Sequence, residues 1–217
     1  ARCLIYVTPD AERTMQTFLG ACTALGPDDI DERVIVSSKI IYFEGYLYDP
    51  PQAKAAFIKA AKLAKKAGRQ VSFSLSDQFC VDRHRDAFLD FVNDYVDVLF
   101  ANEDEIKSLY QVDSFDEALG SVRGACNIVA VTRGSSGSVI VSGEQTYTLV
   151  AEKVRDIIDT TGAGDAYAAG FLYGLTQGKD LEMCGRIGGI LAADIIGDYG
   201  ARSKNDLKVV LDKSLSG

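Results

Sequence analysis

Short apolar runs alternate with amphipathic helical patterns along the first part of the chain. Runs of β-branched and aromatic residues predict buried strands, and apolar residues spaced three or four apart predict helices. The runs that predict strands are 3–8, 39–43, 71–75, 96–100 and 128–132. The patterns that predict helices are 52–66, 83–95, 103–110 and 115–122.

The remaining sequence predicts two short strands followed by helices. The strands lie around 139–141 and 146–149, with a turn at Gly143, and the helices are 163–177, 181–196 and 205–211. Alternation of strands and helices predicts an α/β fold, a three-layer α/β/α sandwich with a mostly parallel central sheet. In such sheets ligands bind at the carboxyl ends of the strands. A length of 217 residues fits one domain over 1–217.

Composition narrows the function classes. The chain has 23 basic and 31 acidic residues, a net charge of −8, which disfavours nonspecific binding to nucleic acid or to an anionic membrane. Its five cysteines form no C-x-x-C pair and His84 is its only histidine, which disfavours a disulfide framework and a zinc site. Because no apolar run reaches membrane-span length and no leader opens the sequence, we expect a soluble, cytoplasmic protein.

The most informative segment is the glycine-rich run Asp159–Asp165, which precedes a helical pattern. A glycine turn into a helix start exposes backbone N–H groups that suit an anion. The run therefore predicts that the amides of Gly162, Ala163 and Gly164 form an anion hole for a phosphoryl group. Asp165 is then placed to take a proton from an attacking hydroxyl. The alternative is a flexible loop in which Asp165 is only a helix-terminus charge.

Three segments together resemble the ribokinase-like sugar and nucleoside kinases, the phosphofructokinase-B group. The run Asp159–Asp165 resembles that family's second signature, and Asn102–Glu105 resembles its N-x-x-E element. Thr132–Gly137 resembles its T-x-G-x-x-G nucleotide turn. Within the family, the segments 74–79 and 100–103 are most similar to adenosine kinase and its bacterial relatives.

The resemblance implies a ribokinase-like kinase reaction. The γ-phosphoryl group of ATP would pass, with Mg²⁺, to a hydroxyl of a sugar or nucleoside, adenosine or ribose-like. Family members begin with a further strand, a substrate-binding segment and a lid sheet. We therefore expect the N-terminal lid portion to be largely missing and the domain to be incomplete at its N-terminus. A non-catalytic nucleotide-binding domain or fragment is the alternative, and exposed sheet edges leave open the pairing of two copies.

Asn102 and Glu105 have two compatible interpretations. An Asn before a helix with a Glu three residues later is typical of a capping box, a purely structural device. The resemblance implies that Asn102 also contacts the cofactor and that Glu105, with Asn102, orders water bound to Mg²⁺.

The resemblance also implies roles for residues that bind phosphate and nucleotide. Thr132, Gly134 and Gly137 would contact ATP, although the same pattern is typical of a tight β-turn. Arg13 would approach the transferred phosphate, and the alternative is a solvated surface arginine.

A monovalent cation site is implied by the same resemblance. Asp159 and Thr161 would offer oxygen atoms to K⁺, and Gly200 would complete the shell or contact the cofactor.

Overall fold

The computed structural model describes residues 1–216, and its largest element is a six-stranded sheet in the order β3-β4-β5-β6-β7-β8. The strands are β3 (Ile40–Glu44), β4 (Gln70–Ser74), β5 (Val98–Asn102), β6 (Ile128–Thr132), β7 (Ser138–Ser142) and β8 (Gln145–Leu149). The first four pair in parallel, with Phe43 opposite Phe73 and Phe73 opposite Leu99. The expected α/β class with a mostly parallel sheet is confirmed.

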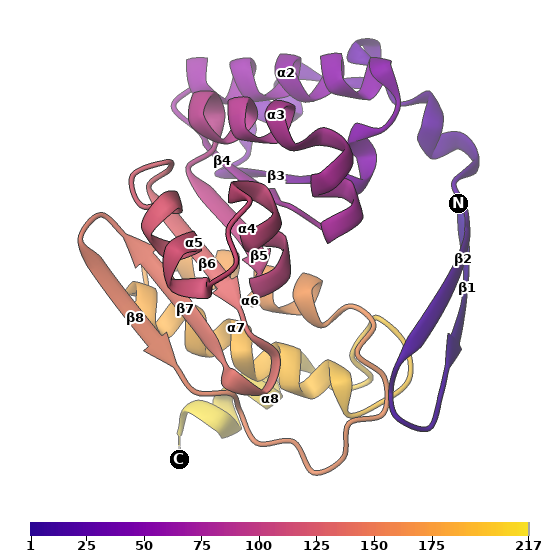
Figure 1. Ribbon diagram of the computed structural model, residues 1–217, viewed down its shortest axis with the longest axis vertical. Coiled ribbons are helices and arrows are strands. Elements are labelled where there is room, and N and C mark those ends of the chain that lie inside the picture. The colour runs from indigo at the N-terminus through magenta and orange to yellow at the C-terminus, as the bar shows by residue number, and fades with distance from the viewer. Residues whose placement is uncertain (217) are drawn as a thin grey trace. The chain divides into compact units, whose positions relative to one another are not determined.

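A separate antiparallel ribbon is formed by β1 (Arg2–Val7) and β2 (Arg13–Phe18), drawn in indigo in Figure 1. The sequence predicted a strand over 3–8 but assigned none to 13–18. All six residues of β2 are exposed. Its sequence, RTMQTF, contains no continuous run of apolar residues like that of β1, so its pattern gave no signal.

The chain divides into two compact units. The first unit comprises 19–132 and 141–146 with Ala1, and the second comprises 2–18, 133–140 and 147–217. The helices of the first unit are α1 (Glu32–Ser37), α2 (Pro51–Lys66), α3 (Gln78–Tyr95), α4 (Glu103–Tyr110) and α5 (Phe115–Val122). Those of the second unit are α6 (Ala163–Thr176), α7 (Leu181–Ile196) and α8 (Leu207–Leu215).

Aromatic rings fill the core of the first unit beneath α2 and α3, which lie side by side in Figure 1. The ring of Phe43 lies 4.7 Å from that of Phe57, and Phe73 meets Phe88 at 5.0 Å nearly edge to face. Each fully buried Phe contributes about 1.5–3 kcal/mol through the removal of its surface from water.

Close helix packing organises the second unit. A Cβ on Gly170 of α6 would lie 2.9 Å from the Cα of Gly188 in α7, so the two helices approach each other through their glycines. On its other side α7 packs with α8 through Ile187, Leu191 and Leu211. These contacts hold the N-terminal end of α6, where the glycine-rich run lies.

Three elements differ from their predicted bounds by two residues or more. The helix expected over 83–95 begins at Gln78 and has a non-helical residue, His84, at φ −127°. The strand expected over 96–100 is Val98–Asn102, and the helix expected over 205–211 is Leu207–Leu215. Helix α1 was not predicted. Within the described residues, no helix combines the length and the apolar character needed to cross a bilayer.

Candidate active site residues

The turn into α6 has the geometry that the glycine-rich run predicts. Gly162 precedes the helix in a left-handed conformation at φ 79°, and a Cβ there would lie 2.9 Å from the Cβ of Ala201. The amide of Ala163 bonds to the Thr160 carbonyl at 3.3 Å, and that of Ala166 bonds to Gly162 at 2.9 Å. Because the first amides of a helix lack intrahelical acceptors, those of Gly164 and Asp165 are the ones open to an anion.

Asp165 lies in the first turn of α6 with an exposed side chain. Partial burial by surrounding atoms raises the pKa of its carboxyl above the ordinary value, although its accessible surface is large. Among the described residues no donor bonds to this carboxylate, so it can accept a proton from a substrate hydroxyl.

Asp159 is the centre of the hydrogen bonds that shape this turn. It is only 2% exposed; Oδ1 accepts the amide of Thr161 at 2.9 Å and its hydroxyl at 2.6 Å, and Oδ2 accepts the amide of Gly200 at 2.9 Å. Burial alone would raise the pKa of Asp159, but the bonds from Thr161 and Gly200 and the charge of Arg13 lower it. These bonds give Asp159 a structural role, and its binding of K⁺ stays a prediction.

Arg13 lies at the start of β2 and reaches the same run. Its Nη1 donates to the hydroxyl of Thr160, so it is tied to the residue between Asp159 and Thr161. Arg13 is nevertheless exposed, so the alternative of a solvated surface arginine stays open, and its contact with phosphate stays a prediction.

The segment that follows β6 is a tight turn. The amide of Arg133 donates to the Gly137 carbonyl at 2.8 Å, and Gly137 has φ 87°. A Cβ on Gly137 would lie 2.0 Å from the carbonyl oxygen of Leu149, so close backbone approach alone requires glycine there. Gly134 also has a positive φ of 53°, and a Cβ added there would have no atom within 4 Å. Thr132 ends β6 and donates to the Ala101 carbonyl at 3.4 Å. Nucleotide contact by these residues stays a prediction.

Asn102 and Glu105 form the capping box of α4. The amide of Glu105 donates to Asn102 Oδ1 at 2.8 Å, and the amide of Asn102 donates to Glu105 Oε2 at 2.9 Å. A third bond, at 2.7 Å, joins Asn102 Nδ2 to Glu105 Oε1. Glu105 is 5% exposed, and burial, with a smaller contribution from Asp77 and Asp104, raises its pKa to about 7.

The first unit also brings forward residues that the sequence interpretation assigned no role. Asp77 caps α3, accepting the Cys80 amide at 2.8 Å, and its other oxygen accepts the hydroxyl of Tyr46 at 3.4 Å. Tyr46, which follows β3, is 51% exposed, and Phe79, in the first turn of α3, is 75% exposed. In the sequence, an aromatic residue just after a predicted strand was the feature that could have pointed to Tyr46 and Phe79.

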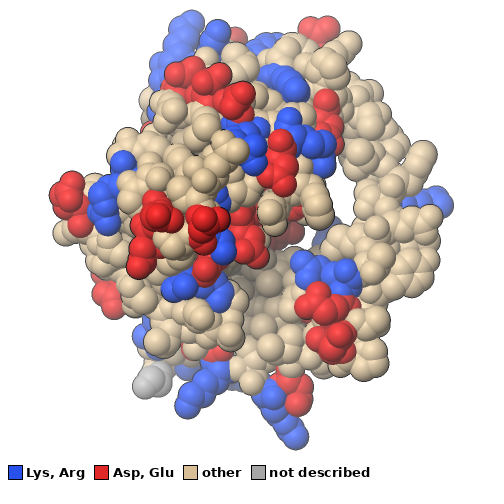
Figure 2. All heavy atoms as spheres, viewed as in Figure 1, with Lys and Arg blue, Asp and Glu red and all other residues tan. Residues whose placement is uncertain are grey.

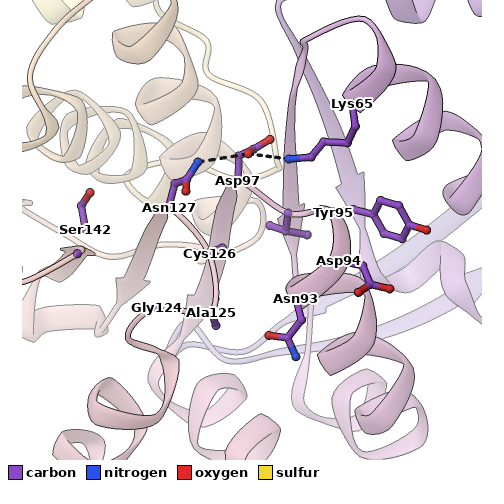
Figure 3. Close-up of a pocket in the computed structure, with 12 residues that line it drawn as sticks. Lys65, Asn93, Asp94, Tyr95, Asp97, Gly124, Ala125, Cys126, Asn127 and Ser142 are labelled. Carbon is purple, nitrogen blue, oxygen red and sulfur yellow. Dashed lines mark hydrogen bonds and ion pairs between the residues drawn. The ribbon is translucent and has the colours of Figure 1, made fainter.

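A hollow of about 650 Å³ lies elsewhere in the first unit, at the amino ends of β5 and β6. There Asp97 accepts Lys65 Nζ at 2.9 Å and Asn127 Nδ2 at 3.3 Å, as Figure 3 shows. Its second oxygen accepts the amide of Val71 at 2.8 Å. These polar groups bond to one another, and ligands of α/β sheets bind at the opposite, carboxyl ends of the strands. The hollow is therefore not the candidate site.

Neither the surface charge in Figure 2 nor a cluster of ligands marks a metal site in residues 1–216. On the face drawn in Figure 2, Lys and Arg side chains are interspersed with Asp and Glu. Over residues 1–216, no three His, Cys, Asp or Glu side chains gather closely enough to hold a metal ion directly. Mg²⁺ usually keeps several waters, so the bonded carboxylate of Glu105 fits ordering of such water. A bound phosphate would depend on nearby amides and arginine.

The chain belongs to the pfkB carbohydrate kinase family, whose family model matches residues 1–208. A probable sugar kinase from Rhizobium etli has a solved structure similar to it, with 47% identity and a TM-score of 0.96 over 98% of this chain and 65% of that chain. The adenosine kinase of Sinorhizobium meliloti is 44% identical, with a TM-score of 0.96 and the same 98% and 65% coverage. These likenesses confirm the predicted ribokinase-like fold class.

A curated relative extends the family assignment. The adenosine kinase of Saccharomyces cerevisiae is 32% identical over 203 residues, which are 87% of this chain and 58% of that protein. The chain spans 42% and 58% of the lengths of two curated relatives, about half in each case.

Proposed function

We propose that the protein containing this chain is an ATP-dependent kinase that phosphorylates a hydroxyl of a sugar or nucleoside. The single observation that carries the proposal is the free carboxylate of Asp165 beside the open amides of Gly164 and Asp165 at the start of α6. A glycine turn, unpaired helix amides and an unbonded base form the set of groups that phosphoryl transfer requires. Family membership supports the same reaction class.

In the proposed reaction the acceptor hydroxyl oxygen attacks the γ-phosphorus of ATP. Asp165 takes the hydroxyl proton, and the bond between the γ-phosphorus and the bridging oxygen breaks, which releases ADP. The open amides of Gly164 and Asp165 stabilise charge on the transferring group, while the Ala163 amide that the sequence also suggested is held by the Thr160 carbonyl; Arg13 neutralises phosphate. ATP would bring Mg²⁺, with Asn102 and Glu105 ordering its bound water, and Asp159 and Thr161 would hold K⁺.

A nucleoside acceptor is supported by the exposed rings of Tyr46 and Phe79. Aromatic side chains bind bases by stacking, whereas a plain sugar gains less from such a surface. Relatives named as adenosine kinases agree with this choice. A sugar acceptor is the alternative, which the sugar kinase relatives support.

The test is Asp165→Asn in the complete protein, which keeps the shape of the side chain but removes the base. Turnover should fall on the order of 10²–10⁴-fold, while ATP affinity changes little. ADP release is measured with adenosine, ribose, fructose and pyridoxal as acceptors, and ATP binding by calorimetry. Near-normal turnover by the variant would reject the role of Asp165. ATP binding without ADP release from any acceptor would favour the non-catalytic alternative.

A further inference from the structure

An acidic residue lies in the last turn of α7, where the helix dipole is unfavourable to it. The carboxyl end of a helix carries partial negative charge, so a carboxylate there needs other partners. Asp194 has two, because Oδ2 accepts the hydroxyl of Ser203 at 2.5 Å and Oδ1 accepts Nδ2 of Asn205 at 2.7 Å. Both oxygens of Asp194 therefore bind the far end of the loop that follows α7.

These bonds tie the end of the loop 197–206 back to the last turn of α7. The amide of Asn205 also donates to Ser203 Oγ at 3.0 Å, so the serine hydroxyl links Asp194 to the loop backbone. Lys204 pairs with Asp198 across the loop, and Asp206 then caps α8 by accepting the Lys208 amide at 2.9 Å. We name Asp194, Ser203 and Asn205 the α7 clasp.

The near side of the same loop forms one wall of the glycine-rich turn. The amide of Gly200 donates to Asp159 Oδ2 at 2.9 Å. Ala201 packs tightly on Gly162, because a Cβ added to Gly162 would lie 2.9 Å from the Cβ of Ala201. The amide of Ile158 donates to the Ile196 carbonyl at 2.9 Å. The loop thus joins the clasp at one end to the turn before α6 at the other.

We infer that Asp194 is a positioning residue for phosphoryl transfer. Through the α7 clasp it holds the loop 197–206 against Gly162 and Asp159, and so fixes the amides and the carboxylate at the start of α6. The inference rests on the proposed function for its catalytic consequence. Its structural part, that the clasp orders the turn, stands without it. Small misplacement of reacting groups is enough to slow catalysis strongly.

The experiment compares Asp194→Ala and Ser203→Ala with two matched controls in the complete protein. Asp206→Ala removes the cap of α8 at the last position of the loop, outside the clasp, and Asp180→Ala removes the cap at the other end of α7, where Asp180 accepts the Met183 amide at 2.8 Å. We expect kcat to fall about tenfold or more in both clasp variants, with KM for ATP changed less than threefold. The controls should keep kcat within about twofold of the wild type.

Hydrogen exchange supplies a readout that does not depend on activity. Amides of 160–164 and 198–204 should exchange faster in the clasp variants, whereas those of β4 and β5 should not change. Ser203→Thr retains a hydroxyl and should restore both kcat and protection. Unchanged exchange at 160–164, or an equal loss of kcat in Asp206→Ala, would overturn the inference. If Asp194→Ala does not fold, Ser203→Ala decides. An inactive wild type would reject the proposed function while exchange still tests the clasp.

Discussion

Helices α4 and α5 begin with the same capping device, yet the two glutamates that complete it have opposite surroundings. In α4 the Glu105 amide bonds to Asn102 at 2.8 Å, and in α5 the Glu117 amide bonds to Ser114 at 3.2 Å. In return, the carboxylate of each glutamate accepts the backbone amide of the capping residue, at 2.9 Å in α4 and 3.1 Å in α5. Glu105 is almost fully buried, whereas Glu117 is exposed.

The two pKa values move in opposite directions. Burial raises that of Glu105 to about 7, while the Ser114 hydroxyl bond lowers that of Glu117. Capping by itself therefore does not require burial of the carboxylate. Glu105 is held where its charge is costly, which is typical of functional carboxylates. Glu117 serves as a natural control for the capping role alone.

The largest expected effect is on the pH dependence of stability. Below pH 4.5 Glu105 is protonated in both states; between 4.5 and about 7 the folded state holds more protons, so stability falls as pH rises. The displacement from 4.5 to about 7 corresponds to about 3 kcal/mol, at about 1.4 kcal/mol per pH unit. Glu105→Gln should remove this slope, as measured by urea unfolding at several pH values.

The matched variant Glu117→Gln should retain the slope of the wild type between pH 4.5 and 7. Because the pKa of Glu117 is lowered, its contribution is present at higher pH and is lost as pH falls through its folded pKa. Parallel stability curves for the wild type and Glu105→Gln would show that burial of Glu105 has no such consequence.

The second expected effect is on activity. If Glu105 orders water around Mg²⁺, Glu105→Gln should lower turnover about 10–100-fold and raise the Mg²⁺ concentration needed for half-maximal rate. Glu117→Gln should leave both quantities unchanged, since it alters only an exposed cap. Steady-state rates over a Mg²⁺ titration make the measurement. Full activity of Glu105→Gln would reduce Glu105 to the structural role that Glu117 has.

Sequence patterns predicted the sheet strands and most helices because burial imposes strong periodicity on them. The expected helices 103–110, 115–122 and 181–196 coincide with α4, α5 and α7. Strand β2 and helix α1 contain no buried residue and were missed, whereas β1 and β8 also contain none and were predicted from their β-branched and aromatic residues. The composition of each segment, as well as its burial, therefore decided which elements could be predicted.

The candidate site was predictable where one continuous segment carries it, as in Asp159–Asp165. The capping interpretation of Asn102 and Glu105 was also available, and its bonds are present. The bond from Arg13 to Thr160 spans 147 positions, and Asp194 meets Ser203 only because α7 ends where it does. Such contacts depend on tertiary packing, which one sequence does not encode in a local pattern.

The smallest expected effect concerns the capping residues themselves. Asn102→Ala removes an acceptor for the Glu105 amide and a donor to its carboxylate, so a nearly buried charge loses a partner. We expect a loss of about 2 kcal/mol in the free energy of unfolding. Ser114→Ala should lose less, because water reaches the exposed Glu117 and replaces the missing hydroxyl. Urea unfolding at pH 8, where Glu105 is ionised, gives the widest gap between the two variants. Equal losses would mean that burial adds nothing to the cap of α4, and the contrast between the two helices would then concern ionisation alone.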